Sequence, residues 1–374
     1  MVRAPRGKIF GKDILQWRNE TRSSLGISED VPVIIAGHQP EFFHPGILAK
    51  FIAGDIVARD VGGELVHLVV DHCMGSLNPI EIPTMQGDQI EVIKFELSAL
   101  VEQVIMKDQK RVVLPRDIEP FATALFNASG DNAAIQIGNA TDALMSPWAS
   151  VDHLIGSSEL LQTEFGLRVI EEMRNDPSRC RESYNHAVSR HKNCGISLLL
   201  NDELPVWYGK HNANFGGLND SIQPRALLLT LLARVSIGDL FVHGTGGMLY
   251  DTIMEQWAFD WLDIVPCKAV MATATLRMPL KEQTIEDARR QYFSPDGELE
   301  KKDQYIKSID RAPYKSSERR KQFQAMHNWL SSLNTRPDEA RYRIAHRIAS
   351  RRDWSFPLYP YLMLDQLREV ILEN

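Results

Sequence analysis

The sequence predicts an α/β protein with a parallel β-sheet, followed by a charged helical C-terminal region. Two segments predict the sheet, because residues 31–73 and residues 220–280 each contain strands and helices in alternation. A change of composition after about residue 280 predicts the helical region. Two strands joined by a helix lie parallel in one sheet, and such sheets bind ligands at the carboxyl ends of their strands.

The first segment forms one complete strand–helix–strand unit. Residues 31–36 are a short apolar run, and residues 65–70 are apolar apart from His67, as in a strand buried on both faces. From residue 47 to residue 60 the apolar residues have helical spacing, and glycines follow directly, as they do at many helix ends. We therefore expect two neighbouring parallel strands that are joined by a helix.

Polar residues follow both strands of this unit. The loop after the first strand holds His38, Gln39, His44 and Gly46, and the second strand ends in Asp71 and His72. Because these strand ends meet at one edge of the sheet, we expect a shared site. Imidazoles at a helix N-terminus can hold phosphates, and an Asp beside a His can orient the imidazole, act as a base or bind a metal. The alternatives are histidines that cap backbone groups, an Asp71 that caps the following turn, and a Cys73 that is a buried structural cysteine.

The second segment repeats the pattern. Asp220 or Ser221 is expected to cap a buried apolar helix that has Pro224 in its first turn. A short strand at residues 239–242 ends in His243, Gly244, Thr245, Gly246 and Gly247. The backbone N–H groups of this glycine-rich turn can form an anion-binding nest, and the alternative is a tight turn needed for helix packing. A helix over residues 248–262 and a strand within residues 265–274 follow.

Weaker patterns fill the remainder of the α/β part. We expect a leading helix at residues 13–24, mostly helical structure over residues 151–191 and loops over residues 195–220. Strand-like pieces are expected at residues 90–95, 111–114 and 133–137.

Composition excludes several classes of protein. A net charge of −7 over 374 residues argues against nucleic-acid binding, and no apolar run is long enough for a membrane helix. The four cysteines form no CxxC pair, so we expect reduced thiols and a cytoplasmic protein. Cys180, His186, His191 and Cys194 match no common zinc module, and no metal site is predicted.

Charge and composition divide the chain into three parts. Residues 1–280 form the α/β core, residues 281–353 form a helical hairpin or short coiled coil, and residues 354–374 are apolar and are expected to dock on the core. Residues 281–353 hold 17 Lys and Arg against 12 Asp and Glu, a net charge of +5, whereas the remainder carries −12. This basic excess fits a solvated helix face, and the alternative is a surface for an anionic substrate or for a partner. A homodimer through this region is one such partner.

Four short motifs together resemble the family of the cysteine-adding enzyme of bacillithiol biosynthesis. They are Gly37-His38-Gln39-Pro40, Asp71-His72, Pro224-Arg225 and the glycines of residues 244–247. That family has a Gly-Gln-Gln-type loop, an Asp-His strand end, an Arg-Pro element and a Gly-rich loop in the same order. His44-Pro45-Gly46-Ile47 also retains half of the His-x-Gly-His signature that holds ATP phosphates in one α/β superfamily. The departures are His for the first Gln, no Pro in the glycine loop, Ile47 for the last His, and a shorter chain.

This resemblance implies a Rossmann-like sheet of the HIGH-nucleotidyltransferase type with helices on both faces, and ATP with Mg²⁺ as cofactors. It implies nucleotide-binding roles for His38, Gln39, His44, Gly46 and the turn Gly244, Thr245, Gly246 and Gly247. Asp71, His72 and His38 would be catalytic, and Arg225 and His243 would hold an anionic group of the substrate.

The sequence therefore predicts a cytosolic enzyme that activates or ligates a small carboxylate- or amine-bearing metabolite with ATP, similar to bacillithiol-type cysteine ligases. Its partner would be a small-molecule substrate, with no nucleic acid or membrane. One alternative is a catalytically inactive protein that binds a nucleotide or a sugar phosphate. Another is an assembly protein that acts through its helical C-terminal region.

Overall fold

The structure is a computed structural model that describes residues 2–73, 79–86, 89–97, 101, 104–191, 194–208, 211–214, 222–280, 299–332 and 339–373. It contains two compact units. The larger unit comprises Met1–Ile80, Phe95–Leu276 and Ser355–Asn374, and the smaller one comprises Glu81–Lys94 and Arg277–Trp354. The predicted helix cap at residues 220–221 and the first part of the predicted helical region, residues 281–298, lie outside the described residues.

The larger unit is built around a five-stranded parallel sheet. Its strands are β3 (Val33–His38), β4 (Glu64–Val69), β7 (His153–Gly156), β11 (Leu240–His243) and β12 (Lys268–Met271). They lie in the order β12-β11-β3-β4-β7, and every neighbouring pair is parallel. Numbered along the chain and read from β7, this is the strand order 3-2-1-4-5 of a Rossmann fold. The predicted fold class is confirmed.

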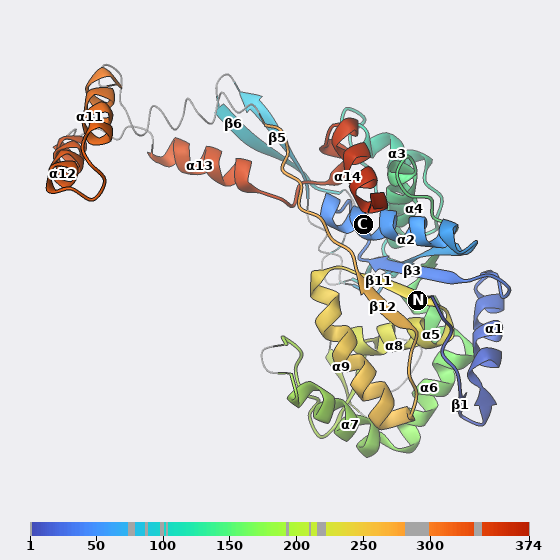
Figure 1. Cartoon of the computed structure of the whole chain (residues 1–374). Coiled ribbons are helices and arrows are strands. Elements are labelled where there is room, and N and C mark those ends of the chain that lie inside the picture. Colours follow the sequence, from blue (N-terminus) through green and yellow to red (C-terminus); the bar gives the residue numbers. More distant parts are fainter. Residues whose placement is uncertain are drawn as a thin grey trace. The chain divides into compact units, whose positions relative to one another are not determined.

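Helices cover both faces of the sheet (Figure 1). One face carries α2 (Pro45–Asp60), α3 (Phe121–Asn127), α4 (Ala133–Met145) and α14 (Tyr361–Glu373). The other carries α5 (Ser157–Gln162), α6 (Glu164–Asn175), α7 (Pro177–Ser189), α8 (Ala226–Ser236) and α9 (Thr245–Leu262). From β3 the chain adds β4 and β7 on one side, with helices on the first face. It then adds β11 and β12 on the other side of β3, with helices on the second face.

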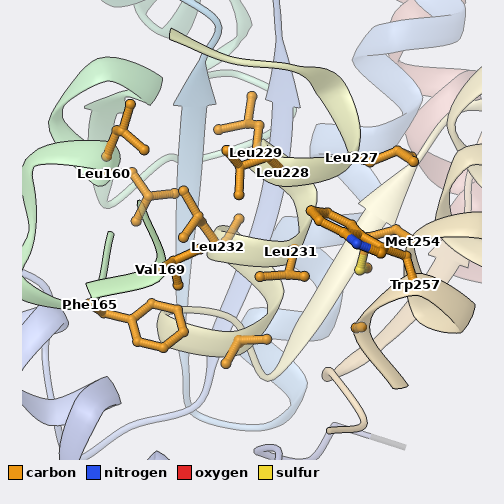
Figure 2. Close-up of a cluster of buried hydrophobic side chains, with 14 of the residues drawn as sticks. Leu160, Phe165, Val169, Leu227, Leu228, Leu229, Leu231, Leu232, Met254 and Trp257 are labelled. Atoms are coloured by element: carbon orange, nitrogen blue, oxygen red, sulfur yellow. The ribbon is translucent and has the colours of Figure 1, made fainter. Parts of the chain in front are cut away.

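The main core lies between the sheet and α8, as Figure 2 shows. Every residue of α8 from Leu227 to Ser236 is buried, which follows from its nearly continuous apolar sequence. Leucines of α8 meet Phe165 and Val169 of α6 on one side and Trp257 of α9 on the other. This packing holds the first turn of α8 beside the carboxyl end of the sheet.

Two arginines of the leading helix α1 (Ile14–Ser24) attach it to the start of β11. Arg18 and Arg22 donate to the Asp239 carboxylate at 2.7 and 2.6 Å, and both also donate to the carbonyl of Ile237. The same carboxylate accepts the backbone N–H of Val33 at 2.8 Å, at the start of β3. Because Arg18 and Arg22 are almost fully buried, this cluster fixes the junction between the two central strands.

Four local predictions are wrong. Residues 195–220, predicted as loops, contain two strands at Glu203–Tyr208 and His211–Asn214. Residues 133–137 belong to α4 rather than to a strand, and the Asn132 side chain caps that helix by accepting from the Ile135 N–H. Pro224 lies in a strand, and the following helix begins only at Ala226. Residues 111–114 form no strand of their own, since they contain a single bridge residue.

Small antiparallel sheets and short helices complete the larger unit. β8 (Glu203–Tyr208) pairs with β9 (His211–Asn214) and with β10 (Ile222–Pro224), and β1 (Lys8–Ile9) pairs with β2 (Lys12–Asp13). The 3-10 helices are η1 (Met106–Asp108) and η2 (Phe356–Leu358). Beyond η2, α14 packs against α2, and in η2 the Phe356 N–H donates to the Phe43 carbonyl just before α2.

The smaller unit consists of a β-hairpin and helices. Its elements are β5 (Ile80–Gln86), β6 (Gln89–Phe95), α11 (Leu299–Arg311), α12 (Ser317–Ser332) and α13 (Glu339–Ser350). Glu81 of the hairpin pairs with Lys94 at 2.7 Å and with Arg351 after α13. Within the described ranges, no helix of either unit has the length and apolar character that crossing a bilayer requires.

Candidate functional site

A pocket of about 770 Å³ opens at the carboxyl ends of the three central strands. It includes Gly37, His38 and Gln39 from the end of β3, His72 and Cys73 after β4, and His243 at the end of β11. The strand order reverses between β3 and β11, because β4 and β7 lie on one side of this point and β12 lies on the other. Rossmann-type sheets bind ligands at this switch point. The structure thus brings together strand ends that the sequence places far apart.

The rest of the pocket wall is mostly apolar. It comes from Leu68, Val70, Ile105, Trp207, Gln223, Pro224, Ala226, Leu229, Thr230, Phe241 and Tyr250. β8, β10 and the first turn of α8 therefore face the strand ends across the pocket. An apolar wall with a few convergent polar groups is typical of a small-molecule site.

His243 is held from behind by a buried acid. Its Nε2 lies 3.1 Å from Asp251 Oδ2, and Asp251 Oδ1 accepts from Arg234 at 2.9 Å. The imidazole also stacks on Phe241, with 4.3 Å between the ring centroids. Asp251 is 2% exposed and Arg234 is fully buried, so the acid lies in a fixed position behind the His243 ring, although neither His243 Nε2 nor Asp251 Oδ2 forms a hydrogen bond within the described residues. The sequence analysis missed both residues.

The glycine-rich turn after His243 is the start of α9 rather than a separate loop. Gly244 is the N-cap, no side chain caps the helix, and Thr245 and Gly246 are exposed. Uncapped N–H groups at a helix N-terminus attract anions. Gly247 has a steric role, because a Cβ there would lie 2.1 Å from His243 Nδ1.

His38 lies among other ionisable groups. Its Nε2 is 2.8 Å from Glu41 Oε1, and Lys50 Nζ donates to the neighbouring Gly37 carbonyl at 2.8 Å. Burial is the main cause that lowers the pKa of His38, and Lys50 lowers it further, while Glu41 opposes the shift. Burial also lowers the pKa of Lys50 to about 8. Lys50 was not predicted, because a lysine in an apolar helix gives no signal of its position behind a pocket.

His72 is connected to Asp71 through a serine that the sequence analysis missed. His72 Nδ1 lies 2.6 Å from Ser157 Oγ, and that hydroxyl donates to Asp71 Oδ1 at 2.7 Å. Asp71 also accepts the Ser158 N–H at 2.9 Å in the first turn of α5. Burial lowers the pKa of His72, whereas Asp71 and a hydrogen bond to the Pro224 backbone raise it.

Asp71 is engaged by structural contacts, and the Cys73 thiol is protonated. Asp71 is 2% exposed, and its carboxylate is occupied by groups of α5, as the capping alternative expects. Burial raises the pKa of the Cys73 thiol to about 12, so the thiol stays protonated at neutral pH. The catalytic role of Asp71 stays a prediction, and the structure places the residue behind His72 rather than in the pocket wall.

The predicted turn of residues 244–247 follows His243 but does not line the described pocket, and His44, Gly46 and Arg225 also lie outside its wall. His44 caps α2 by accepting the Gly46 N–H at 3.1 Å, and a Cβ at Gly46 would lie 2.6 Å from the Ala274 carbonyl. Arg225 is 7% exposed, pairs with Glu203 at 3.4 Å and donates to the Val206 carbonyl. Their roles in binding ATP or substrate stay predictions, and each has a structural role.

Three of the four separate metal-ligand candidates have individual structural environments. Cys180 is buried in α7, His186 is exposed and pairs with Asp260 at 2.8 Å, and the Cys194 thiol lies 3.9 Å from the Ile196 carbonyl. Among the residues that the structure describes, no group of three or more His, Cys, Asp or Glu has a metal-binding arrangement.

Comparisons with known proteins give little guidance. No protein-family model matches the sequence, and a search of curated proteins found no match. Among solved structures, the chain is similar to tryptophanyl-tRNA synthetase of Plasmodium falciparum, with 10% sequence identity and a TM-score of 0.33. That similarity covers 91% of this chain and 76% of the synthetase chain. A TM-score this low supports no conclusion about function, so the function has to be argued from the site.

Proposed function

We propose that this protein is an enzyme that uses ATP to activate or ligate a small carboxylate- or amine-bearing metabolite in the pocket at the switch point. The observation that carries the proposal is the meeting of His38, His72 and His243 from three adjacent strands at one pocket. Three imidazoles at a strand-end pocket supply hydrogen-bond donors and proton-transfer groups, which both nucleotide binding and group transfer require.

The pocket offers different environments for the two ends of a nucleotide. The apolar wall from β8, β10 and α8 suits the base and ribose. The uncapped N-terminus of α9, next to His243, suits the phosphates, because helix N–H groups and an imidazole donate to anions. The described wall holds no carboxylate, so Mg²⁺ would be carried by the phosphates and water rather than by protein ligands.

His72 and His38 are the candidate proton-transfer groups. Burial lowers both pKa values, so both imidazoles are neutral and able to accept a proton at neutral pH. Ligation to an amine requires loss of a proton from the attacking nitrogen, and a neutral imidazole in the pocket can accept it. The finer proposal, similarity to bacillithiol-type cysteine ligases, is supported by Gly37, His38 and Gln39 in the pocket wall.

The test combines binding with turnover. Calorimetry should detect ATP binding with Mg²⁺, and a pool of small carboxylates and amines should stimulate release of AMP or ADP. His243→Ala should weaken ATP by about 5- to 150-fold, since a hydrogen bond to a charged group contributes about 1–3 kcal/mol. His72→Ala should reduce turnover more than binding. His186→Ala is the matched control, because His186 is an exposed histidine of α7 that is not in the pocket wall.

The same experiment separates the alternatives. Binding of ATP without turnover in any metabolite pool would favour the catalytically inactive nucleotide-binding protein. Absence of ATP binding in the unmodified protein would refute the proposal and would favour the assembly function.

The helical region gives the assembly function some support of its own. α12 has no buried residue among those described, and Ile306, Tyr314 and Phe323 are exposed beside each other around one groove. A homodimer through residues 281–353 would cover these side chains. Light scattering tests it, and replacement of Phe323 by Lys should shift a dimer to monomer.

A further inference from the structure

We propose that Trp207 and Gln223 form a binding subsite for an amino-substituted planar heteroaromatic ring, such as the adenine of ATP. The proposal deepens the function proposed above and rests on it, because it assigns one part of the pocket to one part of the ligand. It is carried by the positions of the two side chains, by the contact behind Trp207 and by an unpaired oxygen of Gln223.

Trp207 and Gln223 are direct neighbours across two antiparallel strands. Trp207 of β8 is paired with Gln223 of β10 in the strand register. Residues paired in this way present their side chains on the same face of a sheet. Both residues line the pocket at the strand ends, so this face of the small sheet forms part of the pocket wall.

Trp207 has one face occupied and a large part of its surface exposed. The guanidinium of Arg225 lies 4.2 Å from the centre of the Trp207 ring, and Arg225 is fixed by Glu203 and the Val206 carbonyl. Even so, Trp207 is 43% exposed. A half-exposed indole in a pocket wall is available for stacking, and a planar ligand can stack only on the face away from Arg225.

Gln223 supplies an unpaired hydrogen-bond acceptor. Its side chain is 4% exposed, and its Oε1 has no hydrogen-bond partner in the described structure. A buried acceptor without a partner is unfavourable, and the terminal torsion of a glutamine turns at little cost. A small rotation toward the pocket would let Oε1 accept a hydrogen bond from a ligand.

These two features together select the chemistry of the ligand. An indole platform favours a flat π-system, and an acceptor at its edge favours a ring that carries an N–H donor in its plane. An adenine ring with its exocyclic amine meets both requirements. A phosphate does not, because it has no flat ring that can stack on Trp207.

The test compares adenosine with purine riboside, which lacks the exocyclic amine, by calorimetry. The unmodified protein should bind adenosine more tightly, by about 2- to 12-fold for one hydrogen bond. Gln223→Leu should remove this preference. Trp207→Ala should weaken both ligands by about 5- to 150-fold, and Trp207→Phe should restore most of the affinity because it keeps a stacking ring.

Controls keep the test decisive. Phe126→Ala removes an exposed aromatic of α3 that is not in the pocket wall, and it should leave both affinities unchanged. The subsite alone is refuted if ATP binds and His243→Ala weakens that binding, but Trp207→Ala leaves the affinities unchanged. It is also refuted if Gln223→Leu leaves the preference for adenosine unchanged. Both the subsite and the proposed function are refuted if the unmodified protein binds neither ATP nor adenosine.

Discussion

Two adjacent glycines at the start of α9 should respond to the same substitution in opposite ways. A Cβ at Gly246 would have no heavy atom within 4 Å, whereas a Cβ at Gly247 would lie 2.1 Å from His243 Nδ1 and 2.6 Å from its Cγ. We therefore expect Gly247→Ala to displace the His243 imidazole and Gly246→Ala to leave it in place. The two variants add the same methyl group to the same turn of the same helix.

The expected magnitudes follow from what holds the ring. His243 stacks on Phe241 and faces Asp251 at 3.1 Å, so the imidazole cannot move without losing these contacts. Forcing a packed side chain from its rotamer costs about 1–3 kcal/mol. A glycine replaced by alanine in a helix gains up to about 1 kcal/mol, which partly offsets that cost at Gly247 and is a net gain at Gly246.

The assay is ATP calorimetry with a thermal unfolding scan of each variant. Gly247→Ala should bind ATP about 5- to 150-fold more weakly, as expected when one hydrogen-bond donor to an anion is lost, with little change in Tm. Gly246→Ala should bind as the unmodified protein does. Equal ATP affinity in the two variants would refute the reasoning that His243 contacts the ligand.

Further predictions concern stability and protonation. Asp239→Ala should lower the free energy of unfolding by about 3–5 kcal/mol in urea denaturation, since it leaves Arg18 and Arg22 buried without their acid. Glu20→Ala, at a half-buried surface pair with Lys12, should cost less than about 1 kcal/mol. Burial lowers the pKa of Lys50 to about 8 from 10.5, so between these pH values the folded protein binds fewer protons than the unfolded chain. As pH rises from 8 to 10, the free energy of unfolding of the unmodified protein should therefore rise relative to that of Lys50→Met by about 1–3 kcal/mol. Parallel changes of the two unfolding free energies with pH would contradict this. Asp71→Asn should lower the pKa of His72 further, because Asp71 is an attractive charge that raises it. NMR titration of the His72 ring measures this, and an unchanged value would show that the Asp71 charge does not act on His72.

Local periodicity predicted the first strand–helix–strand unit well. Residues 31–36 and 65–70 correspond to β3 and β4, and the predicted helix corresponds to α2. These segments carry a strong apolar pattern, and their neighbours along the chain are also their neighbours in space. The parallel pairing of β3 with β11 was implied by the repeated pattern, although more than two hundred residues separate them.

Errors arose where a local pattern admits two structures. The run Ala133 to Ile137 is apolar enough for a strand, but Asn132 caps it as a helix. Pro224 is allowed in the first turn of a helix, but the pairing of β10 with β8 places it in a strand. That pairing is long-range, so it leaves no trace in the spacing of nearby residues.

The candidate site was predictable in its position and less so in its members. Strand ends that carry His38, His72 and His243 can be recognised from the sequence, because fold topology alone brings such ends together. Lys50, Asp251 and Ser157 could not be found in this way. Each acts through a contact between two different elements of the fold, and each lies in a helix where its residue type is unremarkable.

The most direct test of the central claim is a crystal structure of the protein with Mg²⁺ and a non-hydrolysable ATP analogue. The account predicts density in the pocket between β3 and β11, with the phosphates beside His243 and the first turn of α9 and the base against Trp207. Density for the analogue at any other place, with this pocket empty, would contradict the claim that the switch point of the sheet is the nucleotide site.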